Sequence, residues 1–253
     1  MAPSPFQTVD DLGLQGCLAL SALLMAQEHR LPVAPTRRMT MKMMLRLCEH
    51  GLIQVPWPEA LWLVVPDAEE TPIEHLQWKL TWSVYERCWL REALADYLDQ
   101  FPRDDHCIGL RLAQWTELVD GEAERFFGQQ LAKHRFDIAW ASDIAFVLKE
   151  LRHLCLSASQ WRYCGWAATR RGASIAQQSG HHNDTVREAI YSELRKRAVN
   201  VSSGAWNCAL PPGNPLPESA LGRCFTRHLA KLGPIYWNEG PNVDALGGWK
   251  EWR

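Results

Sequence analysis

The sequence predicts a mainly α protein with one β-hairpin near its N-terminus and a multi-helix body after it. Three observations lead to this prediction. Apolar residues recur at helical spacing over most of the 253 residues. One stretch, Leu76 to Val84, instead alternates apolar and polar side chains, the period of a half-exposed strand. The regular strand–helix alternation of α/β enzymes is not found in the sequence.

The composition indicates a globular protein of the cytoplasm. With 47% hydrophobic and 22% charged residues, the chain is long and apolar enough to bury a core without disulfides. Its eight cysteines are widely spaced, with no CxxC pair, which favours reduced thiols. The first ten residues do not resemble a signal peptide, and the apolar segment Leu12 to Met25 is too short to span a bilayer. We therefore expect a cytoplasmic localisation and no membrane partner.

Two helices and a hairpin are expected in the N-terminal third. Thr8 to Asp11 resembles a capping box, and the helix it opens should end near His29, before Pro32. A second helix should start at Pro35 or Thr36 and stop at Gly51. Its apolar stripe is Met39, Met43, Met44 and Leu47. Strands at Leu61–Val65 and Leu76–Val84, joined by a polar loop, then form the hairpin.

The rest of the chain is expected to be helical and to form a second domain. We place the boundary between residues 1–83 and residues 84–253. The expected helices are Tyr85–Phe101, Ile108–Leu118, Gly121–His134, Ala141–Ser157, Ala158–Gln178, Asp184–Val199 and Ser219–Leu232. Val201–Pro217 is rich in proline and should be a loop. The tail, Gly233 to Arg253, carries Tyr236, Trp237, Trp249 and Trp252, so it should dock on the body or on a partner.

The segment from Thr40 to Ile53 resembles the recognition-helix end of winged helix-turn-helix domains. In both, an amphipathic helix closes on a glycine, leads into a strand and is followed by a wing. The resemblance covers residues 12–83, and His29 to Thr40 leaves room for one helical turn at most in place of the usual middle helix. It implies a nucleic-acid contact, to duplex DNA, through Arg37, Arg38, Lys42 and Arg46. The alternative interpretation of these residues is an ordinary solvated helix face.

Three other clusters carry groups capable of chemistry. His181-His182-Asn183-Asp184 is the densest, although Asn183 or Asp184 also suits a helix cap. Asp104 to Cys107 places a thiol beside a histidine, and its aspartates equally suit a cap. Cys224 and His228 lie four residues apart without a second ligand pair. None of these predicts a metal site, and no cofactor is expected.

Charge and tryptophan content favour a binding protein over an enzyme. The formal charge is only −2, yet acidic residues gather from Glu59 to Asp105 and basic ones from Arg170 to Arg197. Thirteen tryptophans suit a large core or a protein interface, including self-association. P-loop, GxSxG, HExxH and kinase motifs are all missing from the sequence. The first hypothesis is a non-enzymatic binding protein. The alternatives are an enzyme around His181–Asp184 and an inhibitor or assembly subunit that uses the acidic face.

Overall fold

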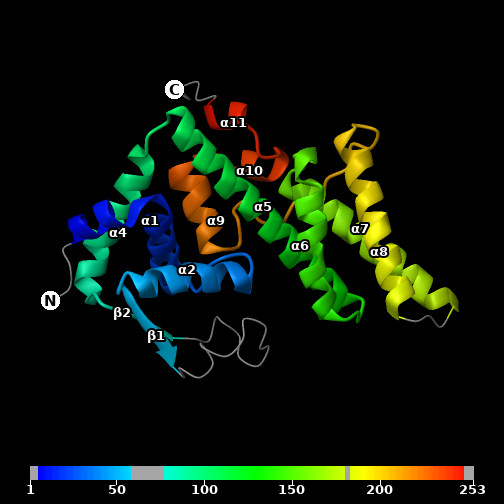
Figure 1. The fold of residues 1–253 in the computed structure, drawn as a ribbon, viewed down its shortest axis with the longest axis horizontal. Coiled ribbons are helices and arrows are strands. Elements are labelled where there is room, and N and C mark those ends of the chain that lie inside the picture. The colour runs from blue at the N-terminus through cyan, green and yellow to red at the C-terminus, as the bar shows by residue number, and fades with distance from the viewer. Residues whose placement is uncertain (1–4, 58–76, 180–182, 248–253) are drawn as a thin grey trace. The chain divides into compact units, whose positions relative to one another are not determined.

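A computed structural model describes residues 5–57, 77–179 and 183–247 (Figure 1). The chain forms two compact units. Unit 1 comprises Met1–Cys107 and Leu216–Lys231, and unit 2 comprises Ile108–Pro215 and Leu232–Arg253. The described part is mainly helical, as predicted, with one short pair of strands. Within the described ranges, none of the helices is long and apolar enough to cross a membrane.

Unit 1 is built around its first helix. Helix α1 (Pro5–His29) packs against α4 (Val84–Gln100) and against the short α9 (Ala220–Cys224), while α2 (Arg37–Glu49) crosses its C-terminal end (Figure 1). The amide groups of Ala220 and Leu221 donate to the carbonyls of Pro32 and Val33, both at 2.8 Å. These bonds attach a segment from late in the chain to the α1–α2 connection. Fully buried side chains of the core include Leu18, Leu20, Leu23, Met44, Leu47, Leu90 and Leu94.

Helix α1 differs from the prediction at its start. It begins at Pro5, so the expected capping box at Thr8 lies inside the helical segment. Gly13 has φ 59° and ψ −178°, a non-helical conformation that interrupts the hydrogen-bond ladder and kinks the segment. Residues 31–36 contain no helix, so the single turn allowed for in this connection is not formed.

The two strands are β1 (Ile53–Trp57) and β2 (Gln77–Leu80), which pair antiparallel with Ile53 opposite Leu80. The expected first strand, Leu61–Val65, lies outside the described residues, and the partner of β2 starts directly after α2 instead. Pro56 made this segment a poor strand candidate in the sequence, but an edge position tolerates a residue without an N–H group. The register shifts between Gln54 and Trp57. The predicted strand residue Val84 begins α4, because Ser83 and Glu86 form a capping box.

In its described residues, unit 2 contains four main helices. They are α5 (Asp105–Lys133) from Ile108 onward, α6 (Ala141–Glu150), α7 (Ala158–Ser179) and α8 (Asn183–Ser202). Helices α7 and α8 lie side by side along much of their length (Figure 1). Short elements complete the unit: the 3₁₀ turns η2 (Ile138–Trp140) and η3 (Arg152–Leu154), and the helices α10 (Ile235–Asn238) and α11 (Val243–Gly247). Trp115, Phe127, Leu131, Ile190, Leu194 and Tyr236 are almost fully buried in the core.

Most predicted helices are found within a few residues of the expected ends, with three corrections. Ile108–Leu118 and Gly121–His134 are one helix, α5, because burial of residues such as Leu118 and Ala123 outweighs the roughly 1 kcal/mol cost of a helical glycine. Ala141–Ser157 ends as α6 at Glu150 and continues as η3, which Cys155 terminates in a left-handed conformation. Ser219–Leu232 is α9 followed by the π-helical turn η4 (Phe225–Leu229).

The first half of the aromatic tail docks within unit 2. Tyr236 and Trp237 are buried, and the indole Nε1 of Trp237 donates to the carbonyl of Pro215 at 2.8 Å. Trp249 and Trp252 lie outside the described residues. The boundary expected between residues 83 and 84 falls inside unit 1, between β2 and α4.

Candidate functional site

Helix α2 is oriented by its cap and its apolar side. The hydroxyl of Thr36 accepts a hydrogen bond from the amide of Met39 at 3.3 Å, which fixes the start of the helix. Thr40, Met44 and Leu47 are buried. The opposite side of the helix therefore faces outward.

The structure separates the four predicted basic residues into two pairs. Arg38 and Lys42, one turn apart, are exposed, whereas Arg37 and Arg46 are half-buried. Arg37, Arg38 and Lys42 each also take part in an interaction within the chain. The outward-facing basic pair is thus Arg38 and Lys42, a smaller set than the sequence indicated.

The C-terminal end of α2 is tied to the beginning of α4. Gly51 has φ +68°, a conformation that lets the chain leave the helix and enter β1 directly. The carbonyl of Leu52 then accepts hydrogen bonds from both the amide and the hydroxyl of Thr81, each at 3.3 Å. Because Thr81 lies three residues before Val84, the first turn of α4 starts close to the end of α2.

The first two turns of α4 expose three large apolar side chains, which we call the α4 aromatic face. Val84 is 76% exposed, Tyr85 72% and Trp89 54%. The rings of Tyr85 and Trp89 form an edge-on pair with centroids 6.4 Å apart. This face was not predicted from the sequence, because Val84 was assigned to a strand and helical spacing does not show whether Tyr85 and Trp89 are covered. The sequence signal for it is the capping pair Ser83 and Glu86 together with two aromatic residues four apart, Tyr85 and Trp89.

The charge of unit 1 limits what this surface attracts. Its sequence contains 12 lysines and arginines and 16 aspartates and glutamates, a formal charge of −4. Arg38 and Lys42 are therefore a local basic feature of an acidic unit. The net negative charge of unit 1 weakens its long-range attraction of a polyanion.

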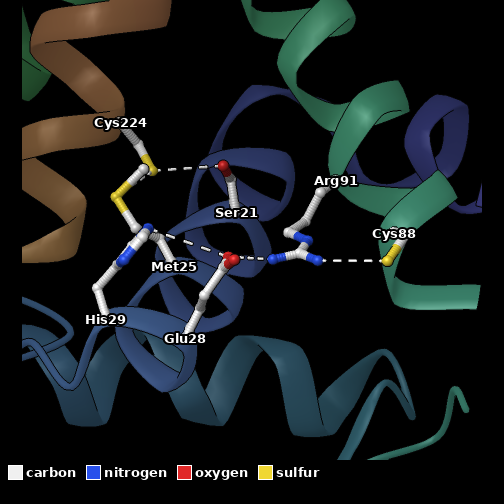
Figure 2. Close-up of polar contacts among 7 residues, drawn as sticks. All are labelled: Ser21, Met25, Glu28, His29, Cys88, Arg91 and Cys224. Atoms are coloured by element: carbon white, nitrogen blue, oxygen red, sulfur yellow. Dashed lines mark hydrogen bonds and ion pairs between the residues drawn. The ribbon is translucent and has the colours of Figure 1, made fainter. Parts of the chain in front are cut away.

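Figure 2 shows a polar network that joins α1 to α4. The guanidinium of Arg91 forms an ion pair with Glu28 and donates to the sulfur of Cys88 at 3.4 Å. These bonds raise the pKa of Arg91, the bond to Cys88 contributing most. The imidazole Nε2 of His29 is 4.0 Å from the Glu28 carboxylate, which is too long for a hydrogen bond. The network links the two helices at the surface.

The second thiol in this region is a poor nucleophile. Cys224 lies 3.3 Å from the hydroxyl of Ser21 and 3.9 Å from the sulfur of Met25, on the other side of α1 from Cys88 (Figure 2). Burial raises the pKa of the Cys224 thiol to about 11, so it is protonated at neutral pH. Histidine does not lie against either sulfur among the contacts described, so the geometry of a thiol–imidazole pair is not met here.

The remaining candidate clusters have structural roles where the structure describes them. Asp104 accepts a hydrogen bond from the amide of Cys107 at 2.9 Å, which caps α5 and lowers the pKa of Asp104. His228 interacts with Asp99 at 3.4 Å rather than sharing a partner with Cys224. His181 and His182 lie outside the described residues, and Asp184 is exposed in the first turn of α8. Across the described ranges, no three His, Cys, Asp or Glu side chains are grouped as metal ligands would be.

No protein-family model matches the chain, and neither a curated protein nor a solved structure is similar to it.

Proposed function

We propose that this protein is a non-enzymatic binding protein that contacts a protein partner through unit 1. The observation that carries the proposal is the exposure of Val84, Tyr85 and Trp89 on consecutive turns of α4. Large aromatic side chains exposed together are costly in water, and tyrosine and tryptophan are the residues most enriched among the energetic centres of protein interfaces.

The placement of this face supports a rigid docking surface. Helix α4 is anchored by its capping box and by the buried leucines Leu90, Leu94 and Leu98. The α4 aromatic face therefore needs little ordering when a partner binds, which lowers the entropic cost of association.

Charge favours a protein over a nucleic acid as the main partner. A unit with a formal charge of −4 repels a polyanion at long range, whereas an apolar contact does not depend on net charge. An apolar contact centred on Tyr85 and Trp89 is compatible with either a different protein or a second copy of this chain.

The test compares tagged wild-type protein with the double variant Tyr85→Ser/Trp89→Ser. Quantitative capture identifies partners that the wild type enriches, and calorimetry with each purified partner then measures affinity. Truncation of one interface hot spot costs at least about 2 kcal/mol, so we expect a loss of roughly 30-fold or more in affinity. Sedimentation velocity of both proteins covers the case of a second copy.

A matched control removes exposed apolar residues from unit 2. Ile138 and Val243 are 54% and 51% exposed, so Ile138→Ser/Val243→Ser removes exposed apolar surface without touching α4. This control should bind and sediment like the wild type. If the Tyr85→Ser/Trp89→Ser protein keeps wild-type affinities and sedimentation, the α4 aromatic face is not the contact surface.

A second candidate, contact with duplex DNA through α2, is favoured by one observation. Arg38 and Lys42 are exposed on a helix that leads through a glycine into an antiparallel strand pair, the order seen in winged-helix domains. DNA binding measured across a salt titration tests it. Arg38→Ala/Lys42→Ala should weaken binding and reduce the salt slope by about two, whereas Arg171→Ala/Lys196→Ala, which removes equal charge from exposed positions of unit 2, should not. Binding that is absent at low salt, or equally weakened by both variants, counts against this candidate.

A further inference from the structure

Unit 2 carries an open groove between α6 and α8. The groove has a volume of about 410 Å³. Val147 and Tyr191 lie along it, and Phe146, which is 74% exposed, stands at its edge. An exposed phenylalanine beside an open apolar floor is an unsatisfied hydrophobic surface.

Two ion pairs join α8 to α6 beside the groove. Arg187 of α8 pairs with Asp143 of α6, and Arg195 of α8 pairs with Glu150 of α6 at 2.9 Å. The bond to Arg195 lowers the pKa of Glu150, so this pair is fully ionised at neutral pH. Both arginines of the groove are therefore already matched by carboxylates.

A hydrogen bond fixes Tyr191, which lines the groove. The hydroxyl of Tyr191 donates a hydrogen bond to the carbonyl of Trp140, which precedes α6. Burial, assisted by Asp143, raises the pKa of Tyr191 to about 12. The hydroxyl consequently remains a neutral donor throughout the physiological range, and its hydrogen bond links α8 to the residue that precedes α6.

Two further carboxylates give the groove an excess of negative charge. Asp184 and Glu188 line it from successive turns of α8, and both are exposed. Neither forms an ion pair within the described part of the chain. With the arginines neutralised by Asp143 and Glu150, the groove presents two carboxylates next to an apolar floor.

We propose that the α6–α8 groove binds a basic amphipathic helical segment of a partner protein. Its apolar side chains pack on Phe146 and on the half-buried ring of Tyr191, and lysines or arginines one turn apart on the segment meet Asp184 and Glu188. The two carboxylates that have no arginine partner disfavour a phosphate group at this position, and the apolar lining is suited to side chains on a helix. The inference is independent of the function proposed for unit 1, because it uses different residues in the other unit.

The experiment uses the whole protein and a defined probe. The probe is a fluorescein-labelled helical peptide of repeating Lys-Leu-Ala-Lys units, and its counterpart carries glutamate in place of lysine. Fluorescence anisotropy measures binding to the wild type, to Phe146→Ala and to Asp184→Asn/Glu188→Gln. Glu92→Gln/Asp96→Asn is the matched control, since Glu92 and Asp96 are also exposed and four residues apart, on α4 of unit 1. Amide hydrogen exchange with and without peptide locates the bound segment.

The expected result is binding of the lysine peptide and not of the glutamate peptide, with about tenfold lower affinity for both groove variants and less than a twofold change for the control. Hydrogen exchange should slow in α6 and α8. Three results would overturn the proposal: a dissociation constant weaker than about 1 mM, an equal loss in the Glu92→Gln/Asp96→Asn control, or undiminished binding by Phe146→Ala. Circular dichroism of each variant verifies that its helix content is unchanged.

Discussion

The hydroxyl of Tyr191 on α8 donates a hydrogen bond to the carbonyl of Trp140, 51 residues earlier in the chain. The hydroxyl of Tyr236, fully buried in the same unit, has no hydrogen-bond partner among the described residues. The hydroxyl of Tyr191 is therefore hydrogen-bonded and, within the part of the chain that the structure describes, the hydroxyl of Tyr236 is not, and the effect of this difference on stability can be measured.

Replacing each tyrosine by phenylalanine should have opposite effects on stability. Tyr191→Phe leaves the carbonyl of Trp140 without its donor and should lower the free energy of unfolding by about 1 kcal/mol. Tyr236→Phe removes a buried hydroxyl that gains no bond there, so it should be neutral or stabilising by up to about 1 kcal/mol. Urea unfolding followed by circular dichroism gives both values. A larger loss for Tyr236→Phe than for Tyr191→Phe would show that the Tyr236 hydroxyl is bonded in solution.

Gly240 should not tolerate a side chain. A Cβ atom at this position would lie 1.7 Å from the carbonyl oxygen of Cys155, and the atom it meets is backbone, which moves only with the whole segment. Gly240→Ala should therefore destabilise unit 2 by about 2 kcal/mol or more. At Gly213 a Cβ meets nothing within 4 Å, and Gly213→Ala should change stability by less than about 1 kcal/mol. Similar melting temperatures for the two variants would contradict the close approach of Gly240 to Cys155.

Alkaline pH should destabilise the protein partly through two buried thiols. Burial raises the pKa of Cys164 to about 12 and that of Cys224 to about 11, from an ordinary value near 9. Above pH 9 the unfolded chain releases these protons while the folded protein retains them, so the stability they support falls as pH rises from 9 toward 11 or 12. Urea midpoints measured from pH 8 to pH 10.5 should fall less steeply for Cys164→Ala/Cys224→Ala than for wild type. Cys88→Ala/Cys155→Ala, at exposed positions, is the control and should keep the wild-type slope.

The Arg91–Glu28 ion pair should contribute little to stability. Its side chains are 36% and 48% exposed, so water and salt screen the attraction (Figure 2). Glu28→Gln should change the free energy of unfolding by less than about 1 kcal/mol, with a smaller effect at high salt. Leu94→Ala, on the buried side of α4, should cost about 2 to 5 kcal/mol and serves as the reference for a core loss. A salt-independent loss on Glu28→Gln as large as that of Leu94→Ala would assign the ion pair a core role.

Local signals in the sequence account for most of the helices. The stretches that became α4, α7 and α8 have apolar residues at helical spacing, and their positions were predicted to within a few residues. Helix caps such as Asp104 could also be predicted from the sequence, because a cap depends on two residues that are three apart. β1 was not predicted, because it pairs with a strand that begins twenty residues after it in the chain, and this pairing outweighs the local effect of Pro56.

The sequence by itself determined that this protein is mainly helical, where most of its helices lie, and that its charge is nearly balanced. Only the tertiary structure decided which residues of those helices face outward. Trp89 and Phe146 are exposed while Trp82 and Trp115 are buried, although all four are large aromatic residues in apolar stretches. Helical spacing identifies an apolar side, but the neighbours that cover it come from distant parts of the chain, as when Ala220 and Leu221 bond to Pro32 and Val33. Exposure, and with it the candidate binding surfaces, is therefore a property of long-range packing.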